Sequence, residues 1–484
     1  MGGQPELASQ SALFGAIDIG ASSGRVIAGL VSSGRLTVRE VHRFSNAPIQ
    51  RADLLVWNFT ELFSQVRTGL RELGAYGERM GRDVVSVGID TWAVDYGLVA
   101  GGELLDQPAC YRDPQNQIGV DQVHSQIDFA QLYGFTGMQF LPFNSLYQIA
   151  RQQALQPELW AQAEQLQLLP DLIGYLLTGL SKTERTNASS TGLLDARTRE
   201  FSAELLQRLK IDPSKFAPLA DAGEELGKIK LEFGRRMSQT RVVLVGSHDT
   251  ASAVVGNPAA KPNFAFLSSG TWSLLGAEIA DPILSEASRQ ANFSNELGVD
   301  GRVRYLKNLS GLWLLSESLR YWQEQGESQN LHQLLDQAAE LPPVAIIDVA
   351  DPRFVAPGPM PELIAEQLIE TNKPGPTSPA EVASVILHSL AKSYSVALAQ
   401  LSELTGLSFD RLHVTGGGSQ NQLLCQLTAD YCQVEVIAGP VEATAIGNLL
   451  IQARAHGLTG KTLEDVRAII RNSDFELSSY LPRD

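Results

Sequence analysis

Short apolar runs separated by turns of small residues dominate the start of the chain. Residues 13–19 and 25–31 are apolar, and Gly20, Ala21, Ser22, Ser23 and Gly24 lie between them. This pattern predicts a strand, a tight turn and a second strand. Residues 84–89 form another apolar run, which predicts a further buried strand.

Strand and helix patterns alternate along the rest of the chain. Helical periodicity covers residues 146–180, with breaks at Pro157 and Pro170, and also residues 251–255, 380–404 and 420–431. Short strands are predicted at 241–245 and 411–414. The mixture indicates an α/β fold.

The opening pattern returns after a segment rich in turn residues. Residues 256–263 hold two prolines, a glycine and two asparagines, a composition typical of a linker. An apolar run at 264–268, the turn Ser269-Gly270-Thr271 and a second apolar run at 272–279 follow. We interpret this as a duplicated architecture, with an N-terminal lobe over 12–258, a C-terminal lobe over 263–460 and an extension over 461–484.

Composition and charge narrow the class of protein. The chain has 484 residues, of which 44% are apolar and 19% charged, and its net charge is −16. This balance disfavours a broad nucleic-acid or anionic-membrane surface. No apolar run approaches the roughly 18 residues of a membrane helix. Residues 1–11 lack a signal-peptide pattern. The three cysteines have neither the spacing of a disulfide framework nor that of a zinc site. We therefore expect a cytoplasmic protein that binds neither nucleic acid nor membrane.

The first candidate site is the turn from Asp18 to Arg25. Backbone N–H groups of a tight turn can wrap an anion such as phosphate, and the hydroxyls of Ser22 and Ser23 can add hydrogen bonds. Asp18 at the strand end suits Mg²⁺ held through water, because this ion keeps several waters. The alternative is an ordinary hairpin turn.

The second half offers two related candidates. The turn at Thr271 repeats the strand–turn–strand pattern of residues 18–25, so two phosphate-binding turns could bind one polyphosphate from both sides. Gly416, Gly417 and Gly418 follow a predicted strand, and a base or ribose could lie against their flat backbone. The alternatives are a second hairpin turn and a plain loop.

A carboxylate at a strand end is the candidate for catalysis. Asp249 lies between His248 and Thr250, where a strand ends and a helix begins. Ligands of open α/β sheets bind near such ends, the helix dipole favours the ionised form, and an ionised carboxylate can accept a proton from a sugar hydroxyl. The alternative is a helix N-cap.

Two further segments carry groups suited to a sugar. Asp90, Trp92 and Asp95 place two carboxylates and an indole after a buried strand, although composition alone favours a hairpin with Trp92 in the core. Asn308 can donate to and accept from a hydroxyl, or it can cap the helix that follows.

Taken in order, these pieces resemble the FGGY family of sugar kinases, and within it the kinases of L-rhamnulose. The resemblance spans residues 14–457. It is carried by residues 18–25, 90–92, 111–113, 136–148, 186–191, 248–254, 269–273, 292–296 and 416–421.

The resemblance implies a fold, a reaction and a set of roles. The fold is two actin-like ATPase (ribonuclease H-like) lobes with a nucleotide and sugar cleft between them, as a monomer or homodimer. The reaction is ATP-dependent phosphorylation of the small ketose L-rhamnulose at O1, with Mg²⁺. The resemblance implies that Asp249 is the general base and that Asp18 holds the metal through water. The implied ATP contacts are Ala21, Ser22, Ser23, Gly24, Arg25, Thr271, Gly416 and Gly417. The implied sugar contacts are Trp92, Ala93, His248, Asp249, Thr250 and Asn308.

Two positions depart from the family pattern. Ala93 stands where the family has glycine, which adds a methyl group beside the substrate, and Ser316 stands where the family has a glutamine that contacts nucleotide. The alternatives are a kinase of another ketose (L-fuculose, ribulose or xylulose) and a non-catalytic actin-like sensor of nucleotide or sugar, or an assembling ATPase.

Overall fold

The computed structural model describes residues 11–261, 264–341 and 345–483, so most of the N-terminal segment tested for a signal pattern, and the last two linker residues, lie outside it. The chain forms two compact units. Unit 1 contains residues 1–262, 278–305 and 442–475, and unit 2 contains residues 263–277, 306–441 and 476–484. Unit 1 is therefore assembled from three separate stretches of chain.

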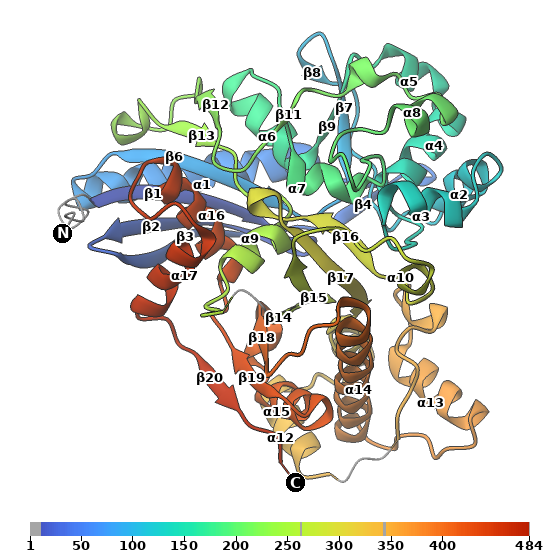
Figure 1. Ribbon diagram of the computed structural model, residues 1–484. Helices are drawn as coiled ribbons and strands as arrows, with labels where there is room; N and C mark the ends of the chain where they lie inside the picture. The colour runs from blue at the N-terminus through green and yellow to red at the C-terminus, as the bar shows by residue number, and fades with distance from the viewer. Residues whose placement is uncertain (1–10, 262–263, 342–344, 484) are drawn as a thin grey trace. The chain divides into compact units, whose positions relative to one another are not determined.

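A six-stranded sheet forms the centre of unit 1, in the order β12-β13-β6-β1-β2-β3 (Figure 1). β1 pairs antiparallel with β2 and parallel with β6, and β6 pairs parallel with β13. The carboxyl ends of β1, β6 and β13 therefore meet at one edge of the sheet. The strands are β1 Ser11–Ile19, β2 Ser23–Ser32, β3 Arg35–Ser45, β6 Val84–Thr91, β12 Glu225–Lys228 and β13 Arg241–Val243.

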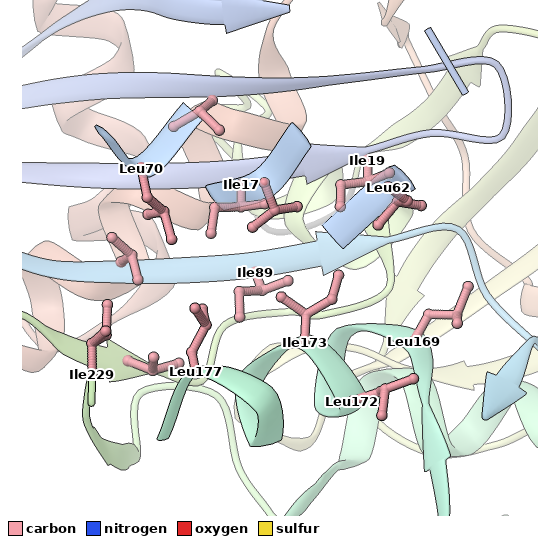
Figure 2. Packing of buried hydrophobic residues seen from close by; sticks show 14 of the residues in the cluster. Ile17, Ile19, Leu62, Leu70, Ile89, Leu169, Leu172, Ile173, Leu177 and Ile229 are labelled. Carbon is pink, nitrogen blue, oxygen red and sulfur yellow. The ribbon is translucent and has the colours of Figure 1, made fainter. Parts of the chain in front are cut away.

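Helices cover both faces of this sheet, which explains the apolar runs. Ile17 and Ile19 of β1 point to one face, against α1 (Phe59–Met80) and α6 (Leu169–Thr178), as Figure 2 shows. Phe14 and Ala16 point to the opposite face and join the core formed with α16 (Ala443–Ala455) and α17 (Leu463–Asn472). Because successive side chains of a strand alternate between faces, a strand buried on both faces has no polar alternation.

Helix α16 also packs very closely on α9 (Asp249–Val255). A Cβ atom built on Gly447 would lie 1.9 Å from the backbone oxygen of Ser252, and one built on Gly256 would lie 1.9 Å from that of Ala443. The contact therefore depends on glycine at both positions.

The remaining elements of unit 1 lie outside this sheet, and one of them, β16 (Ser294–Leu297), pairs with β17 (Val303–Ser310) in a second sheet. β4 and β5 form a hairpin, and β8, β7 and β9 form a small sheet. These elements are β4 Pro48–Arg51, β5 Leu54–Trp57, β7 Tyr96–Ala100, β8 Glu103–Leu104, β9 Gln165–Leu168, β10 Thr183–Glu184, β11 Leu219–Ala220, β16 Ser294–Leu297, α2 Asn116–His124, α3 Phe129–Thr136, α4 Ser145–Leu155, α5 Pro157–Gln162, α7 Arg185–Ala188, α8 Ala203–Arg208 and α10 Glu286–Gln290.

Unit 2 contains a sheet with the same opening device. β14 pairs antiparallel with β15 and parallel with β18, which pairs parallel with β19. β17 (Val303–Ser310) crosses the boundary between the units at residue 305. The other elements are β14 Ala265–Ser269, β15 Trp272–Ile279, β18 Arg411–Thr415, β19 Glu435–Ala438, β20 Ser478–Tyr480, α11 Trp313–Glu324, α12 Leu331–Ala339, α13 Met360–Glu370, α14 Pro379–Thr405 and α15 Gln422–Cys432.

The main elements predicted from the pattern are confirmed, including the strand–turn–strand device in both halves. Two interpretations were wrong. The helical region at 146–180 also contains β9, and residues 88–97 do not form a hairpin, because β6 and β7 belong to different sheets. Among the described residues, α14 alone is long and apolar enough to span a membrane, and 72% of its most apolar window is buried in the protein, as in a core helix.

Candidate active site

Three of the predicted segments meet at the edge of the unit 1 sheet. Thr91, the last residue of β6, forms a parallel bridge with His248, and its N–H donates to Ser247 O at 2.9 Å. The N–H of Trp92 donates to Ile19 O, the end of β1, at 3.1 Å. The first phosphate turn, the Trp92 segment and the His248-Asp249 pair therefore lie side by side.

Asp249 is the first residue of α9, and its carboxyl is close to two neighbours. Its Oδ1 accepts from Thr250 Oγ1 at 3.1 Å and lies 3.4 Å from His248 Nε2, and its side chain is 31% exposed. Burial raises the pKa of Asp249, and the charge of Asp18 adds to this, while His248 and the hydrogen bonds of Thr250 oppose it. The shift is opposite to the one a helix N-terminus alone produces, and it favours proton acceptance near neutral pH.

The loop before Asp249 is anchored by Glu184. This carboxylate is fully buried, and its Oε2 accepts from Ser247 N at 3.1 Å and from Ser247 Oγ at 2.7 Å. It also accepts from Thr186 N and Thr186 Oγ1. Since Ser247 directly precedes His248 and Asp249, these bonds fix the position of the loop that leads into the two catalytic candidates.

His248 contacts two buried charges on its other side. Arg304 Nη2 donates to His248 Nδ1 at 3.1 Å, and Glu296 Oε2 lies 3.2 Å from the same nitrogen. Arg304 is 0% exposed and Glu296 3% exposed. His248 thus lies between this ion pair and Asp249.

The first phosphate turn is held by its own backbone and by Asn46. Gly20 N donates to Ser23 O at 2.9 Å, and Asn46 donates to Ser22 O and Gly20 O at 3.0 Å each. Ser22 is exposed, and Ala21 and Ser23 are half-buried. Gly24 is required by packing, because a Cβ there would lie 2.2 Å from the ring of Phe44.

Arg25 is paired with two carboxylates. Its Nε donates to Asp18 Oδ2 at 3.0 Å, and its Nη1 lies 2.7 Å from Glu442 Oε2. Burial disfavours the charged guanidinium, but Asp18 and Glu442 outweigh this and raise the pKa of Arg25. The two ion pairs fix the guanidinium beside Asp18.

The carboxylates at the ends of β1 and β6 fit a magnesium ion that keeps several waters. Asp18 and Asp90 are in register on the two strands, and Asp90 Oδ1 is a buried oxygen without a hydrogen-bond partner. Burial and the charge of Asp18 raise the pKa of Asp90 well above its usual range. No group of three or more potential metal ligands occurs within the described part of the chain.

The Trp92 segment is pinned by the buried carboxyl of Asp95. Asp95 Oδ2 accepts from the indoles of Trp57 at 2.6 Å and Trp92 at 2.9 Å, and Oδ1 accepts from Gln148 at 2.8 Å. Trp92 is 6% exposed, and Ala93 beside it is half-buried. The indole N–H is therefore occupied, and Ala93 O accepts from Asp95 N at 2.9 Å.

The predicted residues of unit 2 also follow adjacent parallel strands. Thr271 lies in the turn after β14, where Trp313 N at the start of α11 donates to Thr271 O at 3.2 Å. Gly416 follows β18, has φ +80°, and a Cβ there would lie 2.8 Å from Ser269 O. Gly417 has open space around it, and Asn308 is half-buried on β17.

Several residues of the site were not singled out from the sequence. Arg304 is a charged residue within the apolar start of β17, and this is the signal that could have found it. Glu184 and Glu296 lie in short polar strands and have no such signal. Asn448 of α16, which donates to Asp90 Oδ2 at 2.5 Å, has no local signal.

Comparison with known proteins identifies the family. The profile of the FGGY family of carbohydrate kinases, N-terminal domain, matches residues 13–256, and that of the C-terminal domain matches residues 265–456. A rhamnulokinase of Bacillus subtilis (strain 168) is 37% identical over 476 residues, covering 98% of this chain and 96% of that protein. A rhamnulokinase of Enterococcus faecalis is 40% identical over 448 residues, covering 91% and 89%.

Solved structures share the fold at low identity. Gluconate kinase from Lactobacillus acidophilus has a TM-score of 0.77 at 16% identity, with 98% of this chain and 94% of that chain covered. Plasmodium falciparum glycerol kinase with ADP has a TM-score of 0.76 at 14% identity, with the same coverage. The predicted α/β fold of the actin-like ATPase type is thereby confirmed. As the resemblance implied, the chain belongs to the FGGY family of carbohydrate kinases, enzymes that transfer phosphate from ATP to a sugar.

Proposed function

We propose that this kinase phosphorylates L-rhamnulose at O1, with Asp249 as the general base and Mg²⁺ bound near Asp18. Relatives named rhamnulokinase that match over nearly the whole chain support the substrate. The observation that supports the base is the half-buried carboxylate of Asp249 at the strand edge, beside both the phosphate turn and the Trp92 segment.

In this mechanism Asp249 orients the O1 hydroxyl and accepts its proton as O1 attacks the γ-phosphorus. The O1–P bond forms, the bond from the γ-phosphorus to the bridging oxygen breaks, and ADP leaves. Phosphoryl transfer has a loose transition state, so positioning and charge matter more than a strong base. Asp249 engages His248 and Thr250 through Oδ1, which directs Oδ2 to the hydroxyl.

The residues of the two turns would bind the nucleotide. The backbone of residues 21–25 and the side chain of Thr271 would hold phosphates, and Gly416 and Gly417 would face the adenosine. Asp18 would hold Mg²⁺ through water, and the ion would neutralise charge on the phosphates. His248, Thr250, Asn308 and the segment at Trp92 and Ala93 would contact the sugar.

Replacement of the base tests the central assignment. Asp249→Asn should abolish turnover in a coupled ADP assay with L-rhamnulose, ATP and magnesium, while ATP affinity measured by calorimetry stays unchanged. Asp128→Asn is the matched control, because Asp128 caps α3 through Gln131 N at 2.8 Å and asparagine caps equally well. Retained turnover in Asp249→Asn would refute the base.

The substrate is tested separately. A panel of L-rhamnulose, L-fuculose, ribulose and xylulose should give the highest kcat/KM for L-rhamnulose. A higher kcat/KM for another ketose would change the assigned substrate. The proposed mechanism would remain, since the base acts on a primary hydroxyl in each case.

A further inference from the structure

One buried ion pair of unit 1 contacts the site without reaching the substrate position. Arg304, on β17, is 0% exposed, and its Nε donates to Leu297 O at 3.0 Å. Its Nη2 lies 3.1 Å from Glu296 Oε2 and donates to His248 Nδ1 at 3.1 Å. Burying a charge of this kind is costly unless it is paired, so a structural or functional reason is needed.

The direction of the Arg304–His248 hydrogen bond determines the form of the imidazole. A guanidinium donates only, since it has no acceptor and stays protonated. Nδ1 of His248 must therefore carry a lone pair, and the proton of the neutral ring is on Nε2. A doubly protonated ring would direct its Nδ1–H at the guanidinium, which the contact opposes.

Glu296 balances the charge of Arg304. Its Oε2 lies 3.2 Å from His248 Nδ1. Among the described residues, no donor forms a hydrogen bond of suitable geometry with this oxygen. Glu296 therefore acts on Arg304 mainly through its charge, which lets the guanidinium stay buried against the ring.

We propose that Arg304, balanced by Glu296, is a positioning residue that holds His248 in the neutral tautomer with the proton on Nε2, so that this N–H faces Oδ1 of Asp249. The distance from Nε2 to Oδ1 is 3.4 Å. An N–H at this point restrains one carboxylate oxygen and leaves the other for the sugar hydroxyl. The opposite tautomer would present a lone pair to Asp249, whereas its Nδ1–H would face Glu296 Oε2 at 3.2 Å. The N–H that Arg304 directs at Nδ1 is the contact that selects between the two forms. This inference rests on the proposed role of Asp249.

The tautomer can be measured without any substrate. In protein labelled with ¹⁵N-histidine, long-range proton–nitrogen correlation spectra distinguish the two tautomers and the protonated ring. The His248 signal is identified as the one missing from His248→Asn. We expect the Nε2–H pattern at neutral pH, and an Nδ1–H or doubly protonated pattern would overturn the proposal.

Substitution of the ion pair tests the consequence for turnover. The double variant Arg304→Met with Glu296→Gln removes both charges and avoids an unpaired buried carboxylate, which favours folding. We expect it to lose the pure Nε2–H pattern and to lower kcat about 100-fold, the size of effect that misplacement of a catalytic group produces, with the KM for ATP unchanged. Arg304→Lys keeps a positive donor and should recover part of kcat.

Arg302→Lys is the control. Arg302 also forms ion pairs in unit 1, donating to Glu278 Oε2 at 3.2 Å and to Glu464 Oε1 at 2.7 Å, and neither carboxylate belongs to α9. Lysine there should lower stability but keep kcat within about twofold. Equal kcat losses in these two lysine variants, or a folded double variant with normal kcat, would refute a positioning role. Absence of kinase activity on every ketose would instead refute the proposed function, and the tautomer measurement would still stand.

Discussion

The close contact between α16 and α9 makes Gly447 a sensitive point of the site. In Gly447→Ala the new methyl carbon would lie 1.9 Å from Ser252 O, whereas ordinary contact begins at 3.4 Å. The helices must therefore separate by about 1.5 Å or distort, which by analogy with overpacked cores costs about 1–3 kcal/mol.

The displacement should reach the catalytic candidate. Ser252 lies less than one helical turn from Asp249, and α9 is only 7 residues long, so the helix moves as a body. A shift of about 1 Å at a reacting group can reduce the rate about 100-fold. We expect kcat/KM to fall by that factor and the urea midpoint of unfolding to decrease.

Gly134→Ala is the control for this prediction. Gly134 also lies in a helix of unit 1, but no atom lies within 4 Å of a Cβ built there. Alanine should leave kcat/KM unchanged and raise the stability by up to about 1 kcal/mol, because glycine is a poor helix former. If Gly447→Ala behaves like Gly134→Ala in both assays, the argument from close packing is wrong.

Three further substitutions test buried acids. Glu184→Gln should lower the free energy of unfolding by about 1–3 kcal/mol and should also lower kcat, because the new amide N–H₂ would face the N–H and O–H donors of Ser247. Urea denaturation measures the first effect and the coupled assay measures the second. Asp171→Asn should cost less than Glu184→Gln in the same denaturation assay, because burial and the charge of Glu184 raise the pKa of Asp171 well above its usual range and so disfavour its charged form. Burial raises the pKa of Asp95 to about 6, above its unfolded value of about 3.9, so its contribution to stability is complete below about pH 4 and is lost as the pH rises through 6. The difference in urea midpoint between wild type and Asp95→Asn should change over that range, and a constant difference would contradict the assignment.

The pattern of apolar and small residues predicts those strands and turns whose structure depends on neighbouring residues in the sequence. β1 is apolar at most positions because both faces of its sheet are covered, and β14 is apolar over residues 265–267. The small residues after both strands mark the turns. Asp249 was found because the sequence pattern changes there from strand to helix, although in the structure residues 244–248 separate β13 from α9. Strand β9 was missed because its four residues lie between helices and pair with β7, which is distant in sequence.

The charged network around His248 could not be predicted in the same way. Glu296 and Arg304 lie on neighbouring strands and pair with each other. Glu184 comes from a distant segment and accepts hydrogen bonds from Thr186 and Ser247. A sequence pattern reports burial along one element, whereas these residues depend on contacts between elements.

The three-segment construction of unit 1 has a consequence for synthesis of the chain. When the ribosome has made residue 262, β1, β2, β3 and β6 exist, but the helices that cover the face bearing Phe14 and Ala16 lie within residues 442–475. Unit 1 is thus the first domain to emerge and among the last to be completed. Until residues 442–475 are made, the apolar face of its sheet is exposed and promotes aggregation. A fragment ending near residue 262 should consequently be insoluble, and co-expressed residues 442–475 are the part able to rescue it.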